Sequence, residues 1–323
     1  MKWGMLIALL AGLVAAVWVV WAVGFDSVWG AVAQAGFDGL ALLCLYSAVV
    51  FISLALAWST MLPPERRLSL RHFYMGRLVR DSIAEISPFS PVGGMVAAAR
   101  LMILKGMNGA YASASVAADA TTEAMAQVVF LAFGVVMAVM HLGGVAGSGP
   151  LLQAMIATLL LAIPGIAGLI FLQKRGSGFA ERLAARFFPQ AKDGVSFRDA
   201  IHHLYDSPKL LAASAFWHLV AWVGAGGATW VAFQLVGANV SFLDAMAIEA
   251  LLSTLRSIAV FVPAAIGVQE GGYVALAQLF GLPAEMGLAV SLLKRAREIV
   301  LGIPALLYWQ SVEGRAALRS AQS

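Results

Sequence analysis

Long apolar runs alternate with short polar segments along most of the chain. A helical span needs about 20 apolar residues, and six runs meet that length, at about 3–23, 38–60, 110–140, 151–172, 210–236 and 286–309. The pattern predicts an all-α, polytopic integral membrane protein with about six full spans. The first run follows Lys2 as in a secretory signal. Because its apolar stretch is too long and its cleavage motif is poor, we expect an uncleaved span.

Two further apolar stretches, 81–105 and 243–282, are interrupted by helix-breaking residues. These residues are Pro88, Pro91, Gly93 and Gly94 in the first stretch, and Pro263 and Gly267 in the second. A proline removes a backbone donor, and an unpaired backbone group in hydrocarbon costs several kcal/mol. Each stretch is therefore expected to be a re-entrant hairpin wrapped in protein or facing a wet cavity. The alternative is a plain proline kink packed against its neighbours.

A half-helix that begins near Gly94 or Gly267 would direct free N–H groups and a positive dipole end into such a cavity. That arrangement suits an anionic group such as a phosphate. We predict that the first hairpin enters from the cytoplasm and the second from the periplasm. The chain would then be a single transmembrane domain, 1–323, with pseudo-repeat halves 1–145 and 146–310 of opposite topology, as in many secondary transporters.

Composition and charge agree with a membrane location. The 323 residues are 61% hydrophobic and 12% charged, with a net charge of +4, and the mean hydropathy is +0.86. Segments 61–80 and 173–209 hold 12 of the 21 lysines and arginines. Basic loops beside spans are typical of the cytoplasmic side, so both termini are predicted in the cytoplasm and no nucleic-acid partner is expected. Segment 173–209 is predicted to lie on the inner membrane surface as an interfacial helix pair.

Several charged residues fall inside predicted spans, where each costs at least about 2.5–3.5 kcal/mol unless it faces a polar interior. In the third span Ser115, Asp119, Glu123 and Gln127 follow four-residue steps and form one polar stripe. Two carboxylates on one face repel each other unless a cation, a proton or an arginine joins them. The candidates for a proton or ion relay are Asp119, Glu123, Glu249, Lys294 and Glu298.

Arginines accompany both broken stretches and the last span. The guanidinium fork matches phosphate oxygens, so Arg100, Arg256, Arg295 and Arg297 are candidate substrate-binding residues. Glu270, just after the second break, is also a candidate. The structural alternative is a set of buried ion pairs that lock helices together, with Lys294 and Glu298 paired at i,i+4.

Other chemistry has little support in the sequence. The five histidines lack metal-ligand spacing, and neither a phosphate loop nor G-x-S-x-G occurs. No metal, cofactor or catalytic residue is therefore expected. The glycine-rich "GAGGATW" at 224–230 predicts close helix packing.

Three motifs carry a family resemblance: "PVGGMVAAAR" at 91–100, "VPAAIGVQEGGYVALAQLFGL" at 262–282 and "LLKRAREIVLG" at 292–302. Together they resemble the transmembrane region of the lysylphosphatidylglycerol synthase family over nearly the whole chain. The family pattern I-P-G-G-x-G-x-x-E is matched here only at Pro263, Gly267 and Glu270. Within the family, the chain looks most like the stand-alone membrane protein associated with hopanoid biosynthesis.

The resemblance implies lipid translocation across a bacterial inner membrane. By their positions in the matching motifs, the residues to which the resemblance assigns this function are Arg100, Pro263, Gly267, Glu270 and Arg295. In the synthases a flippase-type region precedes a cytosolic aminoacyl-transferase domain. About 14 residues follow the last predicted span here, too few for such a domain, so we expect no aminoacyl-transfer enzyme.

The leading expectation is a flippase or transporter for an anionic or polar-headed lipid, a hopanoid or a phospholipid. One alternative is an intramembrane lipid-modifying enzyme with Asp119 and Glu123 as acid and base. The other is a non-transporting scaffold that gathers lipid-biosynthesis enzymes. Membrane lipids are the expected partners in each case, and the oligomeric state is left open.

Overall fold

The computed structural model describes residues 25–86, 91–142, 149–175, 195–259 and 262–322, and within them the chain is helical and contains no strand. The elements are α2 (Phe25–Met61), η1 (Pro64–Arg66), α3 (Leu70–Ile86), α4 (Pro91–Leu104), α5 (Gly109–Leu142), α6 (Gly149–Arg175), α8 (Phe197–Tyr205), α9 (Pro208–Leu235), α10 (Phe242–Ile258), η2 (Pro263–Ala265), α11 (Val268–Leu279) and α12 (Ala284–Gln322). The all-α, multi-pass prediction is confirmed. The predicted span 3–23 and the break residue Pro88 lie outside the described residues.

Among the described residues, four helices are long and apolar enough to cross a membrane: α2 from Val32, α5, α6 and α9. They cover four of the predicted spans. The predicted span 286–309 lies inside α12, which is 39 residues long. It falls outside the apolar group because four charged residues occupy positions 294–298.

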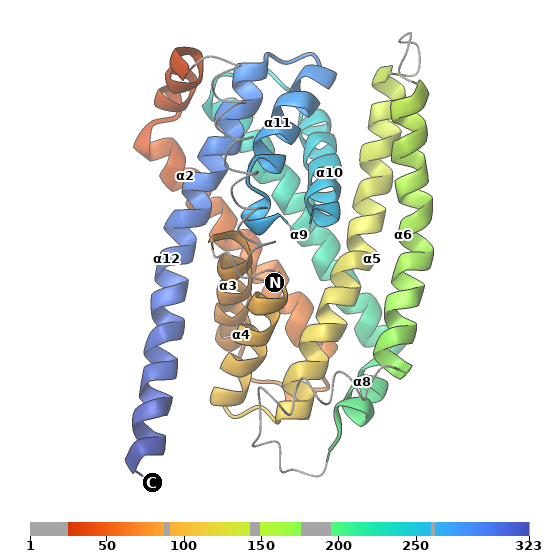
Figure 1. Cartoon of the computed structure of the whole chain (residues 1–323), viewed down its shortest axis with the longest axis vertical. Coiled ribbons are helices and arrows are strands. Elements are labelled where there is room, and N and C mark those ends of the chain that lie inside the picture. The colour runs from red at the N-terminus through yellow and green to blue at the C-terminus, as the bar shows by residue number, and fades with distance from the viewer. Residues whose placement is uncertain (1–24, 87–90, 143–148, 176–194, 260–261, 323) are drawn as a thin grey trace.

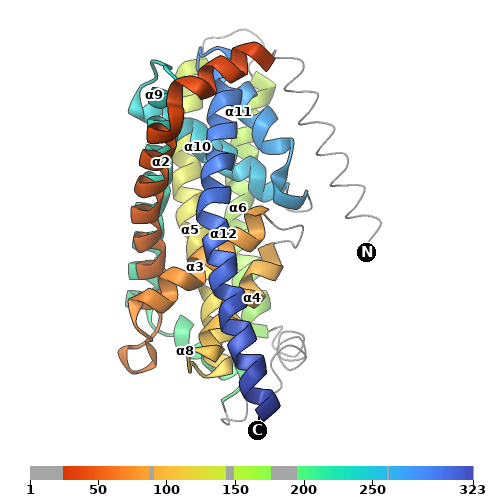
Figure 2. The same cartoon turned by 90° about the vertical axis from the view of Figure 1, so that its left-hand side faces the viewer.

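Two short helical hairpins face each other along the long axis of the bundle (Figures 1 and 2). The pair α3 and α4 occupies the lower half of the view, and the pair α10 and α11 occupies the upper half. A helix of 17 residues, the length of α3 and of α10, extends only about 25 Å, less than the hydrocarbon thickness of about 30 Å. Each pair therefore returns to the end from which it entered, and the tips meet near the middle of the long axis (Figure 1).

The second hairpin turns through a strained backbone. Ala264 and Ala265 have φ angles of 53° and 47°, and Gly267 has φ 81°. Left-handed backbone costs a non-glycine residue about 1–2 kcal/mol, so the surrounding packing must impose this turn. The half-helix α11 then begins at Val268, directly after Gly267, where the sequence predicts it.

In the first hairpin, α4 begins at Pro91 rather than near Gly94. Proline suits a first helical turn, because its missing N–H would have no intrahelical partner there. Gly94 has a different role: a Cβ atom on it would lie 2.3 Å from the backbone oxygen of Arg80. This glycine therefore sets the close approach of α4 to α3, whereas Gly93 stays part-buried beside it.

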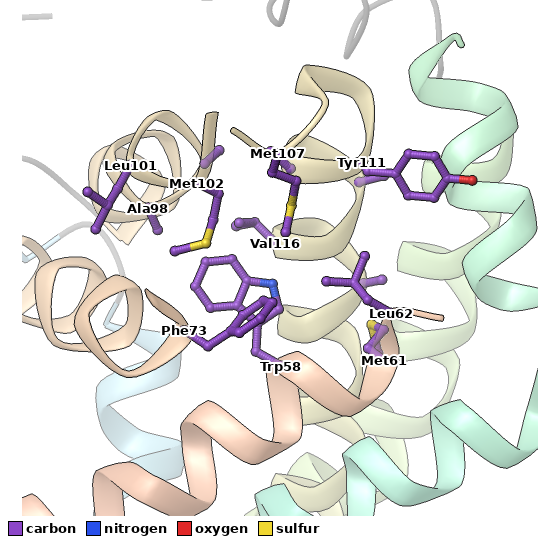
Figure 3. Packing of buried hydrophobic residues seen from close by; sticks show 14 of the residues in the cluster. Trp58, Met61, Leu62, Phe73, Ala98, Leu101, Met102, Met107, Tyr111 and Val116 are labelled. Carbon is purple, nitrogen blue, oxygen red and sulfur yellow. The ribbon is translucent and has the colours of Figure 1, made fainter. Parts of the chain in front are cut away.

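A hydrophobic cluster fixes the first hairpin against its neighbours (Figure 3). Trp58 of α2 packs edge-on against Phe73 of α3, with ring centroids 5.3 Å apart, and its indole N–H donates to Ser115 of α5. Met102 of α4 lies over the same indole (Figure 3). Because these side chains come from four helices, their burial positions α3 and α4 relative to α2 and α5.

The glycine-rich segment of α9 packs closely against α2 and α10, as predicted. A Cβ atom on Gly224 would meet Val50 at 2.8 Å, and one on Gly227 would meet the Tyr46 hydroxyl at 2.1 Å. On the α10 side, a Cβ atom on Gly226 would meet Met246 at 2.6 Å. The absence of a side chain at these glycines therefore allows α9 to approach α2 and α10 closely.

The predicted interfacial segment 173–209 contains the short helix α8. Its apolar residues Phe197, Ile201 and Leu204 are buried, and α8 packs on the lower part of α5 (Figure 1). Any second helix of the predicted pair would fall in 176–194, outside the described residues. The interfacial location and the halves 1–145 and 146–310 remain predictions.

Candidate functional site

The two hairpin tips are joined by an ion pair. Arg256, in the last turn of α10, donates through Nη2 to a carboxylate oxygen of Glu85, in the last turn of α3. Arg256 also interacts electrostatically with Glu298 of α12. The long helix α12 therefore contributes charge to the place where the hairpins meet.

The first turn of α11 carries its own anion. Glu270 accepts a hydrogen bond from the Gly267 N–H at 2.7 Å, and its other oxygen lies 3.0 Å from Nε of Arg295. The sequence predicts that this helix N-terminus would receive a ligand's anionic group. In this conformation the protein's own carboxylate caps it.

Arg295 and Arg297 reach the same place from α12. Glu298 binds both, at 3.4 Å from Arg295 and 3.3 Å from Arg297, and Arg297 also donates to Ser47 of α2 at 3.4 Å. Nη2 of Arg295 and Nε of Arg297 are buried with no partner among the described residues. We call this group the tip cluster; its members are Glu85, Arg256, Glu270, Arg295, Arg297 and Glu298.

The tip cluster balances in charge, with three arginines and three glutamates. The sequence predicts a cation-lined site, and here carboxylates accompany the cations. Two guanidinium N–H groups nevertheless remain open to an acceptor. Buried donors without partners are costly, so an anionic group at this place would relieve that cost.

A second group of charges lies between α3, α5 and α9. Arg77 and Arg80 of α3 each approach Asp119 at 2.9 Å and also bind Glu123, at 2.9 and 2.7 Å respectively. Asp81 lies 3.3 Å from Arg77. The Arg77 and Asp119 side chains are only 1% exposed. We call this group the α3–α5 cluster; its members are Arg77, Arg80, Asp81, Asp119, Glu123 and His218 of α9.

The polar stripe predicted on the third span contacts other helices along its length. Ser115 accepts from Trp58 of α2 at 3.1 Å, and Gln127 donates to Ser257 of α10 at 2.9 Å. The two carboxylates between them meet the α3 arginines. One stripe thus contacts both hairpins.

Lys294 does not pair with Glu298, the partner that i,i+4 spacing suggests. Its Nζ lies 2.7 Å from Glu249 of α10 and 2.9 Å from the Thr229 hydroxyl of α9. Tyr273 of α11 donates to the same glutamate oxygen at 2.7 Å. These interactions join α9, α10, α11 and α12. The partners of Lys294 are far from it in sequence, and tertiary packing brings them together.

Arg100 lies apart from the tip cluster. It binds Glu313 of α12 at 3.1 Å, and both side chains are about one-third exposed, at 38% and 30%. The other predicted residues fall into three groups. Four of the substrate-binding candidates lie in the tip cluster together with Glu298: Arg256, Glu270, Arg295 and Arg297. Asp119 and Glu123 belong to the α3–α5 cluster, and Glu249 pairs with Lys294.

Sequence reasoning missed Arg77 and Arg80 by assigning them to the basic loop segment 61–80. That assignment is wrong because α3 begins at Leu70, so both arginines lie inside the hairpin. The available signal was the four-residue spacing of Arg77, Asp81 and Glu85, which places three charges on one helix face. His218 carried no comparable signal, because it is a lone histidine in an apolar helix.

These features define a multi-pass helical membrane protein in which two opposed re-entrant hairpins carry buried charge. A comparison with family models matches residues 5–305 to the lysylphosphatidylglycerol synthase transmembrane region. The chain therefore belongs to this family and is a lipid-related membrane protein. A search of curated proteins finds no match. The finer likeness to the stand-alone hopanoid-associated protein stays a prediction.

Proposed function

We propose that the chain moves a lipid with an anionic or polar headgroup across the bacterial inner membrane. The observation that carries this proposal is the pair of buried N–H groups of Arg295 and Arg297 at the junction of the hairpins, which have no partner within the described part of the chain. Guanidinium groups match phosphate oxygens in shape and charge, and a phospholipid or a polar-headed hopanoid would bring such acceptors to that depth.

The hairpins supply a route for the headgroup. Because they enter from opposite ends and meet near the middle of the long axis (Figure 2), a headgroup bound at the tip cluster would have one hairpin on either side of it. Separation of Arg256 from Glu85 would open the junction, while the acyl chains stay in the bilayer. Rocking of one half against the other around a fixed site is the movement that inverted-repeat transporters use.

A structural role alone accounts poorly for this arrangement. Buried ion pairs stabilise a fold weakly, since apolar residues of similar volume often serve as well or better. The strained backbone at Ala264 and Ala265 lies at the tip of the second hairpin, and strain of this kind gathers at functional sites. The buried ion pairs of the tip cluster and the strained backbone both lie where the two hairpins meet.

The basic residues support a cytoplasmic location for the lower end in Figure 1. The elements that end or lie there are η1, α8, the C-terminal turn of α6 and the C-terminus of α12. They carry Arg66, Arg198, Lys174, Arg175 and Arg319. By the positive-inside rule, this end and the C-terminus face the cytoplasm, and the first hairpin opens from there.

Reconstitution into liposomes tests the proposal. The purified chain is incorporated into vesicles that hold fluorescent phosphatidylglycerol or phosphatidylcholine in the inner leaflet, and arrival at the outer leaflet is followed by chemical quenching. We expect movement faster than in empty vesicles and at least about tenfold slower with Arg297→Gln, because a charge-assisted hydrogen bond is worth about 1.5–3 kcal/mol. The control is Arg315→Gln at the exposed end of α12, where the side chain donates hydrogen bonds to Ser311 in the preceding turn of its own helix.

Movement no faster than in empty vesicles for every lipid tested would reject the transporter. Mass spectrometry of the same vesicles separates the remaining readings. A new lipid species would indicate a lipid-modifying enzyme. No movement together with no new species would favour the scaffold.

A further inference from the structure

His218 of α9 is buried inside the bundle and is bonded on one side only. Its side chain is 0% exposed, and Nε2 lies 3.0 Å from Oδ1 of Asp119. Nδ1 is buried with no partner among the described residues. This geometry fits the neutral imidazole that carries its proton on Nε2 and donates it to the carboxylate.

The charges around this pair do not balance. Oδ2 of Asp119 accepts from Arg77 and Arg80, and the same two arginines bind Glu123 and Asp81. Two guanidinium groups thus face three carboxylates, which leaves a formal charge of −1 when His218 is neutral. Unbalanced charge is costly away from water, so a proton on His218 would bring the α3–α5 cluster to neutrality.

The present conformation does not accommodate that proton. A proton added at Nδ1 would create a buried N–H with no acceptor, at a cost of about 1–3 kcal/mol. Ser214 lies one turn earlier on α9, and its hydroxyl is bonded to the Thr122 hydroxyl of α5 at 2.9 Å. Protonation therefore favours a rearrangement that brings Nδ1 to water or to such an acceptor, so proton binding and conformation are coupled.

Other helices packed on α9 are α2, α8, α10 and α12. Among the described residues, none of their charged groups forms an ion pair or hydrogen bond with His218 or Asp119. Several of their titratable groups have partners elsewhere: Glu249 and Lys294 bind each other, Tyr205 binds Thr121 and Gln173, and His203 binds Tyr111. The groups that act on His218 therefore come from α3 and α5.

We propose that His218 and Asp119 form the proton-binding site that couples lipid movement to a proton gradient. The proton binds Nδ1 from one side of the membrane, while the Nε2–H stays on the ring and hydrogen-bonded to Asp119. After the rearrangement, the Nδ1 proton leaves to the other side. This inference rests on the proposed lipid transport, and it names the coupling ion for that transport.

The test imposes a pH gradient on the same proteoliposomes. With one proton per lipid, each pH unit should sustain about a tenfold ratio of labelled lipid between the leaflets, and a protonophore should abolish that ratio. In His218→Gln the amide can still donate to Asp119 but cannot titrate, so the response to the gradient should be lost. The matched control is His203→Gln on α8, at an exposed histidine, which should keep the response.

Solution NMR of ¹⁵N-labelled histidine in nanodiscs gives a readout that does not depend on transport. The signal absent from His218→Gln identifies His218, and its ¹⁵N shifts distinguish the neutral Nε2–H form from the doubly protonated form; we expect both forms to be observed across a pH series. A His218 signal that stays neutral throughout would overturn the inference, as would a wild-type leaflet ratio indifferent to the gradient. Absence of any lipid movement in the wild type would instead reject the proposed function, and with it the coupling.

Discussion

Arg256 of α10 donates a hydrogen bond to the Glu85 carboxylate of α3, and the pair spans 171 positions of sequence to join the two hairpin tips. The two side chains are 23% and 26% exposed, so the pair is neither free in solvent nor sealed in the core. An interaction that must form and break during a transport cycle would need this intermediate environment. Its strength is therefore measurable and bears directly on the proposed function.

A double-mutant cycle with Glu85→Gln and Arg256→Gln should give a coupling energy of about 1–3 kcal/mol, because the residues share one network. Thermal unfolding in detergent provides the stabilities. The same cycle on Arg100 and Glu313 serves as control, and since that pair is more exposed, its coupling should lie below about 1 kcal/mol. Equal coupling in the two cycles would show that the tip pair is an ordinary surface contact.

Lys294 and Glu249 provide a second, more deeply buried case, with side chains 3% and 8% exposed. Replacing Lys294 with Met leaves the glutamate uncompensated, so stability should fall by about 3–5 kcal/mol. The double variant Lys294→Met/Glu249→Gln removes both charges and should recover more than half of that loss. Unfolding temperatures of the two variants check this. A double variant as unstable as the single one would mean that hydrogen bonds, rather than charge balance, dominate the site.

The spans were predictable because hydrophobic length alone defines them: α5 and α6 follow their apolar runs closely. The stripe from Ser115 to Gln127 was also predictable, since four-residue spacing aligns side chains on any helix. The pairing of those side chains was not. Lys294 has a suitable partner four residues away, yet it binds Glu249, 45 positions earlier, because tertiary packing brings α10 nearer to it.

The α3 arginines show a different limit. Charge counting over a loop assumes that the loop ends where hydrophobicity rises, and α3 is too polar to reveal its beginning at Leu70. Arg77 is consequently buried at 1% exposure, although its position in the sequence resembles that of Arg66 and Arg67. Besides Asp81 on the same helix, Arg77 is paired with the α5 carboxylates Asp119 and Glu123, and no local pattern connects these two to α3.

Membrane orientation can be tested directly, because Cys44 is the only cysteine in the chain. In a Cys44→Ala background we expect Glu65→Cys, in η1, to react with an impermeant maleimide only after the cells are opened. Asn239→Cys, in the connection between α9 and α10, should react in intact spheroplasts. Both positions are exposed, so reactivity reports the side of the membrane rather than burial. The reverse pattern would invert the topology and move the entry of the first hairpin to the periplasm.

Gly94 offers the sharpest test of the first hairpin. A Cβ atom there would lie 2.3 Å from the Arg80 backbone oxygen, and a backbone atom cannot move aside without displacing α3. Gly94→Ala should therefore cost about 1–3 kcal/mol and shift Arg80 relative to Asp119 and Glu123. Thermal unfolding measures the loss of stability, and the rate of lipid movement in vesicles shows whether the displacement of Arg80 affects transport. Gly165→Ala is the matched control, because its Cβ on α6 would meet nothing within 4 Å; there the higher helix propensity of alanine should leave stability equal or raise it by up to about 1 kcal/mol. If both variants behave alike, α4 does not pack against α3 as closely as this hairpin requires.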